Sequence, residues 1–326
     1  MAENSNIEWT HHTFNPWIGC QKVGPGCDHC YAESWDARGL QQRETRWGPH
    51  AARTRTSAAN WRKPLSWDRA AAAGERHRVF CASLADVFDN HASILPEWRA
   101  DLWQLIWDTP HLDWMLLTKR PGNIVKMLPR GWRNGWSNVW LGCTVVNQAE
   151  ADRDIPKLLE VPATVRFLSM EPLLGPVDLR SWIGSHPYIG TSTYAGLDGL
   201  RRCDLSGNTG LLDLVIVGGE SGPGARPMHP DWARSLRDQC QAAGVAFHFK
   251  QWGEWGPGAT RDTPADRAEQ VGTLWSVSTV FGGPAYLAIR EGDISQLMER
   301  FGKKAAGRLL DGRTWDEMPG AHNARS

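Results

Sequence analysis

Six short apolar runs, rich in β-branched and aromatic residues, constrain the fold of this chain more than any other feature of its sequence. They lie at residues 79–83, 114–118, 139–144, 165–169, 214–218 and 245–249. The runs are nearly continuous in apolar residues, which is typical of parallel strands covered on both faces. The sequence therefore predicts a parallel sheet of about six strands.

Segments with helical spacing lie between these runs. Residues 96–108 open with proline and repeat apolar residues at helical spacing, and residues 231–243 begin at Asp231, a candidate cap. Residues 122–128 and 151–160 carry weaker helical patterns. Repeated alternation of strand and helix predicts an α/β fold, either a partial or a complete (β/α) barrel resembling a TIM barrel.

Two regions interrupt this alternation. Residues 181–210 are rich in Gly, Ser and Thr without a period, which predicts an inserted loop or lid, and residues 256–290 are also loop-like. The tail then has a helical pattern at residues 293–300 and a basic run at residues 302–308. We expect a barrel-like domain at residues 1–255 and a C-terminal extension at residues 256–326 that packs on it.

The charge balance and the tryptophan content bear on whether the chain binds nucleic acid. Lys and Arg together number 36, as do Asp and Glu, so the chain has no overall basic character for indiscriminate nucleic-acid binding, although a local basic cleft remains open. The 19 tryptophans are scattered along the whole chain, which favours core packing over a base-stacking surface.

The N-terminus lacks a signal pattern, and no apolar run approaches the roughly 18 residues that a membrane span needs. We therefore expect a cytoplasmic protein with no membrane association. In that compartment thiols stay reduced, so clustered cysteines are ligands more often than disulfides.

Three cysteines stand close together near the N-terminus. Cys20, Cys27 and Cys30 follow the spacing C-x6-C-x2-C, with glycines and a proline between the first two. Glycines let the backbone curl so that thiolates converge. A closed structural zinc site needs four ligands, for which His11 or His12 is a candidate. A 4Fe-4S cluster held by three cysteines leaves one iron open to a reactant. The remaining cysteines, Cys81, Cys143, Cys203 and Cys240, look structural.

Polar or glycine residues follow every predicted strand. In parallel α/β folds the site lies at the carboxyl ends of the strands, so these residues predict one shared site. We assign cofactor-binding roles to Ser83, Asp86, Thr118, Ser169, Gly218, Gly219 and Gln251, and catalytic roles to Lys119, Arg120, Glu171, Glu220 and Lys250.

The charged members of this set suggest specific chemistry. Lys119 and Arg120 could clamp a phosphate or a carboxylate, with the arginine as a bidentate donor. Glu171 and Glu220 could bind ribose hydroxyls or an amino group, or act as acid or base. A salt bridge from these carboxylates to Lys119 or Lys250 is compatible with such roles.

Further motifs surround the three cysteines. They are IEWT (7–10), TFNP (13–16), GCDHCYAE (26–33), LTKRP (117–121), LSMEPLL (168–174), VGGESG (217–222), KQWG (250–253) and GRLLDG (307–312). With these motifs the chain resembles an uncharacterised family found in phages, mobile elements and bacterial genomes. Members carry the three-cysteine motif and are often encoded beside a three-Cys-motif partner protein. The resemblance spans nearly the whole chain and is weakest at residues 181–210 and 256–290.

That family is in turn similar to divergent radical S-adenosylmethionine enzymes, in which three cysteines hold a 4Fe-4S cluster at the top of a partial (β/α) barrel. The commonest spacing there is C-x3-C-x2-C, whereas the first gap here is six residues. The resemblance implies a 4Fe-4S cluster and S-adenosylmethionine as cofactors, an electron donor, the partner protein, and hydrogen abstraction by a 5′-deoxyadenosyl radical. Phage association, Lys119 with Arg120, the basic tail and the tryptophans suggest a nucleotide or nucleic-acid base as substrate.

Two other functions remain open. One is a non-enzymatic module in which Cys20, Cys27, Cys30 and a histidine hold zinc, and which binds nucleic acid or a protein partner. The other is a nuclease or phosphoesterase that uses Asp86, Glu171 and Glu220 with a divalent ion, which leaves the cysteines without a role.

Overall fold

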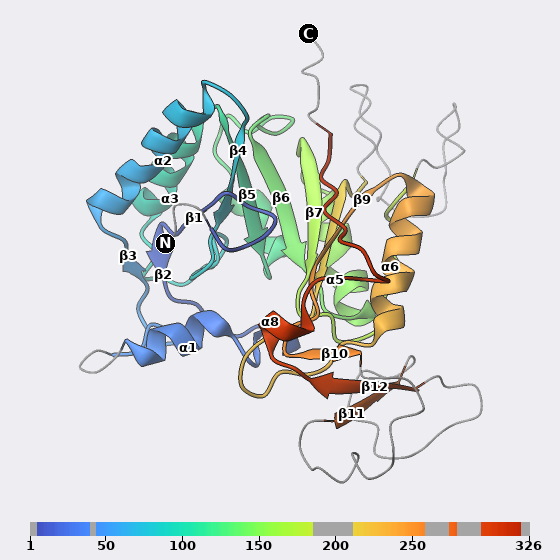
Figure 1. Cartoon of the computed structure of the whole chain (residues 1–326). Helices are drawn as coiled ribbons and strands as arrows, with labels where there is room; N and C mark the ends of the chain where they lie inside the picture. Colours follow the sequence, from blue (N-terminus) through green and yellow to red (C-terminus); the bar gives the residue numbers. More distant parts are fainter. Residues whose placement is uncertain (1–4, 40–43, 185–210, 258–273, 279–294, 321–326) are drawn as a thin grey trace. The chain divides into compact units, whose positions relative to one another are not determined.

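The computed structural model describes residues 5–39, 44–184, 211–257, 274–278 and 295–320 (Figure 1). Its largest sheet has seven strands in the order β1-β4-β5-β6-β7-β8-β9. The bounds are β1 His12–Phe14, β4 His77–Cys81, β5 Leu112–Thr118, β6 Val139–Thr144, β7 Val165–Met170, β8 Leu214–Gly218 and β9 Ala246–Gln251. The pairs β1–β4, β4–β5, β5–β6 and β8–β9 are parallel.

The strand order confirms the expected α/β class. Apart from the short β2 and β3, each strand lies beside the next one in the chain, which is how a (β/α) barrel is wound. A doubly wound open sheet would reverse its order at a switch point. All six predicted runs are strands, but the sheet has seven, because β1 is too short and too polar to be recognised from its sequence.

The chain divides into two compact units. The first unit contains residues 1–144 and 154–167, and the second contains residues 145–153 and 168–326. Helix α5 (Gln148–Leu159) and strand β7 cross the division. The expected boundary after residue 255 falls within strand β10 (Trp255–Pro257), and the expected division into a barrel and an extension stays a prediction.

In the first unit, helices and short elements surround the strands. They are α1 Tyr31–Arg38, α2 Ala58–Ala71, α3 Pro96–Trp107 and α4 Ile124–Met127, the 3-10 turns η1 Pro25–Cys27 and η2 Pro121–Asn123, and the antiparallel pair of β2 Trp17–Ile18 with β3 Thr54–Arg55. The core is aromatic: Trp9, Phe14 and Trp114 are fully buried. Gly142 on β6 leaves room for the ring of Phe167, which would lie 2.5 Å from an added Cβ.

In the second unit, helix α6 (Pro230–Ala243) packs against β9. Its cap is His229, whose Nδ1 accepts a hydrogen bond from the backbone N–H of Asp231, so the expected cap at Asp231 is wrong by two residues. The helix ends at Gly244, whose φ of 67° suits glycine.

The expected helix at residues 293–300 is wrong. Residues Ser295–Arg300 form β12, the middle strand of an antiparallel sheet with β10 and β11 (Leu274–Ser278). Pairing on both sides overrides the helical spacing of the sequence. The basic run that follows contains the short helix α8 (Lys303–Ala306).

Two other expectations concern the inserted segment and membrane spans. Most of the expected insert, residues 185–210, lies outside them. None of the helices that the structure describes has the length and apolar composition of a membrane span.

Candidate functional site

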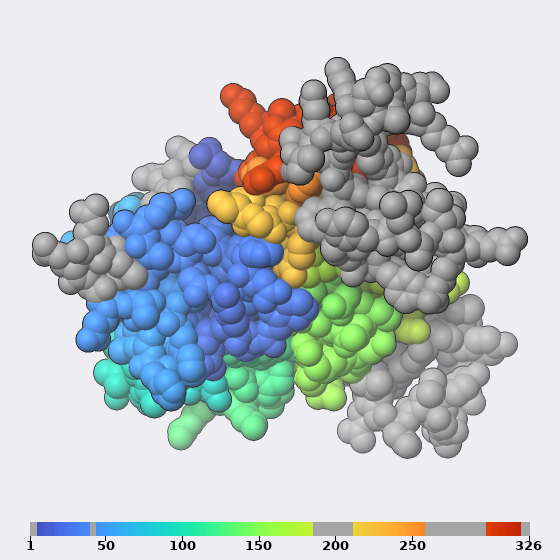
Figure 2. Space-filling view, turned by 90° about the horizontal axis from the view of Figure 1, so that it is seen from below, coloured from blue at the N-terminus to red at the C-terminus, as the bar shows by residue number. Residues whose placement is uncertain are grey.

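The cysteine loop is fixed beside the residues that follow β4. The backbone N–H of Gly19 donates to the Leu84 carbonyl (3.0 Å), and Gly19 forms a parallel bridge with Ala85. Gly19 has a φ of +118°, and an added Cβ would lie 2.5 Å from the Arg46 carbonyl oxygen, so only glycine fits here. Figure 2 shows the blue N-terminal part of the chain, which includes α1, at the surface on this face.

Asn15 and Tyr31 connect the cysteine segment to Ser83. The Asn15 amide donates to Ser83 Oγ (2.9 Å), and its oxygen accepts from the Leu84 N–H (2.6 Å). The Tyr31 hydroxyl, at the start of α1, donates to the Ser83 carbonyl (2.5 Å). Ser83 therefore positions the loop through its hydroxyl and its backbone.

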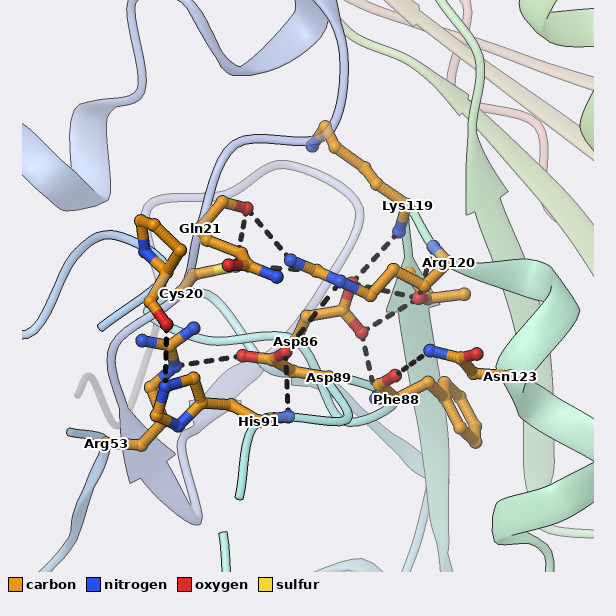
Figure 3. Close-up of polar contacts among 12 residues, drawn as sticks. Cys20, Gln21, Arg53, Asp86, Phe88, Asp89, His91, Lys119, Arg120 and Asn123 are labelled. Atoms are coloured by element: carbon orange, nitrogen blue, oxygen red, sulfur yellow. Dashed lines mark hydrogen bonds and ion pairs between the residues drawn. The ribbon is translucent and has the colours of Figure 1, made fainter. Parts of the chain in front are cut away.

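Arg120, just after β5, reaches the loop from the other side. Its Nη1 lies 3.6 Å from Cys20 Sγ, and its Nη2 donates to the Gln21 carbonyl at 2.9 Å (Figure 3). Burial raises the pKa of Cys20 to about 11; Asp86 adds to this rise, while Arg120 opposes it. Cys20 is thus a neutral thiol at neutral pH unless a further cation binds it.

Asp86 holds Arg120 in place. Its Oδ2 lies 2.8 Å from Arg120 Nη1 and accepts from the Lys119 N–H (3.2 Å). Thr118 Oγ1 donates to the same carboxylate at 2.8 Å, and the Phe88 N–H does so at 2.9 Å. Burial disfavours the charge of Arg120, yet Asp86 and Asp89 raise its pKa above the ordinary value. Arg120 is therefore permanently charged beside the sulfur.

A second, deeper ion pair supports the first. Arg53 Nε lies 2.9 Å from Asp89 Oδ2, and both side chains are fully buried. The other oxygen of Asp89 lies 3.8 Å from Arg120 Nε. Arg99 braces the same loop through the carbonyls of Val87 and Asp89 (3.2 and 3.0 Å). Two arginines and two aspartates thus alternate in one connected network (Figure 3).

Lys119 differs from its neighbours in this network. Its backbone contacts Asp86, whereas its half-buried side chain extends away from the carboxylates (Figure 3). Among the described residues, the Lys119 ammonium group has no hydrogen-bond or ion-pair partner. Within the part of the chain that the structure describes, this ammonium group is therefore available to a ligand.

The other two cysteines lie further along the loop. Cys27 ends η1, and Cys30 is the N-cap residue of α1. Cys20 and Cys30 both pack against the apolar cluster of Ala32, Trp47 and Leu84. All three cysteines are free thiols of intermediate exposure. No three Cys, His, Asp or Glu side chains in the described parts of the chain are arranged to hold a metal ion, so the three sulfurs are not gathered as ligands here.

His11 and His12 do not approach the cysteine loop. His12 Nε2 lies 3.1 Å from His77 Nδ1, and His11 Nδ1 accepts a hydrogen bond from the Arg78 N–H. Both partners stand at the beginning of β4, whereas the cysteine loop lies beyond its end. Neither histidine is placed as a fourth ligand.

In the second unit, the residues expected at the site form separate pairs. Glu171 Oε1 lies 2.9 Å from Lys250 Nζ, which confirms that the two form a salt bridge, and Ser169 Oγ donates to Glu171 Oε2 (3.3 Å). Gly218 makes this arrangement possible, because an added Cβ would lie 2.6 Å from Glu171 Oε1.

Glu220 is buried and bound by Arg226, whose Nε and backbone N–H both lie 2.8 Å from Oε2. Gly219 lies so close to the next chain segment that an added Cβ would meet the Trp252 carbonyl at 1.8 Å. Gln251 donates to Ser221 Oγ (3.0 Å), and its buried Oε1 has no hydrogen-bond partner among the described residues.

The structure thus groups the expected residues by unit. In the first unit, the expected residues surround the carboxyl ends of β4 and β5. They are Cys20, Ser83, Asp86, Thr118, Lys119 and Arg120. Sequence reasoning missed Arg53, Asp89 and Arg99. Asp89 follows Asp86 by three residues after a strand, a signal that could have been used, whereas Arg53 lies in an irregular segment with no pattern.

Comparison with known proteins adds a family. The sequence model of a family described as a protein of unknown function, DUF5131, matches residues 4–319. The chain belongs to the DUF5131 family. The DUF5131 match includes the three cysteines and every strand of the large sheet. Searches of curated proteins and of solved structures gave no significant match.

Proposed function

We propose that this chain is an iron–sulfur enzyme of the radical S-adenosylmethionine type, in which Cys20, Cys27 and Cys30 hold a 4Fe-4S cluster. One observation carries the proposal. The sulfur of Cys20 lies beside the carboxyl ends of β4 and β5, where parallel α/β folds place their sites, and a buried, charged arginine donates to it. A cysteine with a purely packing role needs no such donor.

The residues present fit this group in kind. Three free thiols come from one glycine-containing loop, and two of them, Cys20 and Cys30, pack against an apolar cluster. The fit rests on donor type, since the three sulfurs are not gathered in the structure. When bound, the cluster supplies the electron for reductive cleavage of S-adenosylmethionine, for which the three cysteines leave one iron open.

The surrounding residues would tune and position the cluster. Hydrogen bonds to the sulfurs shift the potential of a cluster, and Arg120 is such a donor, held by Asp86 and Asp89. The ammonium group of Lys119, which has no partner in the described ranges of the chain, could bind a carboxylate or a phosphate. The guanidinium of Arg120 is bound by Cys20, Gln21 and Asp86. We therefore propose Arg120 as a positioning residue and not as a phosphate-binding or carboxylate-binding residue.

The second-unit residues have narrower proposed roles. Glu171 and Glu220 are each paired with a cation, so both suit accepting hydrogen bonds from hydroxyl or amino groups. Gln251 has a buried oxygen that no described residue hydrogen-bonds, which suits the same task. A nucleotide or nucleic-acid base as substrate, an external electron donor and a partner protein complete the proposal.

The structure favours neither alternative. The zinc module lacks the fourth ligand that the sequence suggested, because His11 and His12 lie at the other end of β4. The nuclease needs carboxylates free to bind a divalent ion, whereas Asp86, Glu171 and Glu220 are each bound by a basic side chain.

The proposal is tested by anoxic reconstitution followed by reduction with S-adenosylmethionine present. We expect 5′-deoxyadenosine to be released by the wild-type chain and by a Cys240→Ala control, since Cys240 is buried in α6. We expect none from Cys27→Ala. A reconstituted wild-type chain that leaves S-adenosylmethionine intact under these conditions would contradict the assignment.

A further inference from the structure

A groove on the first unit lies between helix α3 and the segment that leads from α4 to β6. It has a volume of about 630 Å³, which is within the range of ligand-binding clefts. The aromatic and basic residues that line it are Trp103, Trp107, Trp136, Arg99, Lys126 and Arg130. Of the residues described above around the cysteine loop, Arg99 alone lines it.

Three tryptophans, Trp103, Trp107 and Trp136, line one side of this groove, and Trp132 packs against two of them. Trp136 contacts Trp103, Trp107 and Trp132, with ring centroids 5.4–5.9 Å apart. Trp103 and Trp132 are buried, and their indole N–H groups donate to the carbonyls of Met127 and Pro162 (2.9 and 2.8 Å). These contacts fix the base of the cluster rigidly.

The outer rings of the cluster face solvent. Trp107 is 64% exposed and Trp136 is half-buried. A tryptophan that serves only the core would not leave most of its ring in water, because exposed indole forgoes the free energy of burial. The rigid base therefore presents aromatic surface to a ligand.

The charges of the groove have one sign. Arg99, Lys126 and Arg130 line it, and no Asp or Glu does. Lys126 and Arg130 are exposed, and neither side chain has an ion-pair or hydrogen-bond partner within the described part of the chain. In a chain of net charge zero, such a concentration of unpaired cations is local and matches an anionic ligand.

We propose that this groove binds single-stranded nucleic acid. Exposed indole rings stack on bases, and unpaired ammonium and guanidinium groups bind phosphates, so the two features together match one class of ligand. A duplex keeps its base faces stacked inside the helix, where Trp107 could not reach them. Helix α3 has 12 residues and is about 18 Å long, enough to follow a few nucleotides.

The position of Arg99 connects the groove to the cysteine site. Arg99 lines the groove and also donates to the carbonyls of Val87 and Asp89, in the loop that holds Arg120. A strand bound along α3 would thus reach the edge of that network. The binding itself requires no iron–sulfur cluster and does not depend on the proposed function.

Fluorescence anisotropy of a labelled single-stranded oligonucleotide tests the inference with the full chain. We expect saturable binding below about 100 μM protein that weakens with salt. Trp107→Ala should weaken binding about tenfold. Lys126→Gln with Arg130→Gln should reduce the slope of log K against log salt by about 1.4, since each phosphate contact in a single strand contributes about 0.7.

Matched variants separate the groove from general effects. Trp35→Ala removes an exposed tryptophan on α1, and Arg62→Gln with Lys63→Gln removes two charges on α2; both should bind like wild type. Cys27→Ala should also bind normally, so the groove and the cluster can fail separately. The inference would be overturned if the chain did not bind the oligonucleotide, or if Trp107→Ala bound it as tightly as wild type. It would also be overturned if a duplex displaced the oligonucleotide equally well, or if the groove bound an acidic protein in place of nucleic acid.

Discussion

At the scale of single residues, Arg120 connects the cysteine loop to the sheet, because one guanidinium contacts Cys20, Gln21 and Asp86. Its position depends in turn on Asp89, which pairs with the buried Arg53. Asp86, Thr118 and Arg120 were recognisable from sequence because they follow predicted strands. Arg53 was not, since only the folded chain brings residue 53 beside residue 89.

The Arg53–Asp89 pair should matter strongly for stability. Asp89→Asn leaves the Arg53 charge buried without its partner, so we expect the free energy of unfolding to fall by about 3–5 kcal/mol. Urea denaturation measures it. As a control, Asp101→Asn removes an exposed partner of Arg55 and should cost less than about 1 kcal/mol. Equal losses in the two variants would show that the buried pair is not isolated from water.

Gly142 provides a second residue-scale prediction. Gly142→Ala places a Cβ 2.5 Å from the Phe167 ring, so overpacking should lower the free energy of unfolding by about 1–3 kcal/mol. Gly74→Ala is the matched control, because no atom lies within 4 Å of its added Cβ, and it should be nearly neutral. Similar thermal midpoints for both variants would contradict the close packing of β6 against β7.

At the scale of elements, the edge strand β1 shows what sequence patterns miss. Long apolar runs gave all six other strands of the large sheet, since burial on both faces leaves a plain signal. β1 has three residues, including His12 and Thr13, and is defined by pairing with β4. The prediction for β12 was wrong for the opposite reason. Its sequence has helical spacing, but pairing with β10 and β11 makes it a strand.

The β1–β4 edge predicts a pH dependence. Burial, with help from His77 and His11, lowers the pKa of His12 to about 4, from 6.5 in the unfolded chain. Between these two pKa values the unfolded chain binds the proton more readily than the folded chain does. The free energy of unfolding should therefore be highest above pH 6.5 and fall by up to about 3 kcal/mol as the pH is lowered towards 4.

Urea midpoints between pH 7.5 and 4 measure this dependence. His248 contributes in the same direction, because burial lowers its pKa to about 4 as well. In a His12→Asn variant the loss on acidification should be smaller than in wild type. An identical pH dependence in the two proteins would mean that His12 titrates normally in the folded chain.

At the scale of the whole molecule, the sequence predicted the α/β class and sequential strands but hid how distant residues assemble. The scatter of 19 tryptophans along the chain suggested core packing, and most described ones are buried. Folding nevertheless brings Trp103, Trp107 and Trp136 together beside Arg99, Lys126 and Arg130. A near-zero net charge conceals such a groove, because charge totals carry no information about position.

Membership of the DUF5131 family covers nearly the whole chain, so a resident cofactor held by the cysteine loop would belong to the full fold and not to an appended module. This claim is tested most directly by iron and acid-labile sulfide in anoxically purified protein. The account predicts about four of each per chain in wild type and in Cys240→Ala, with both lost in Cys27→Ala. Zinc without sulfide, or iron and sulfide that survive in Cys27→Ala, would contradict it.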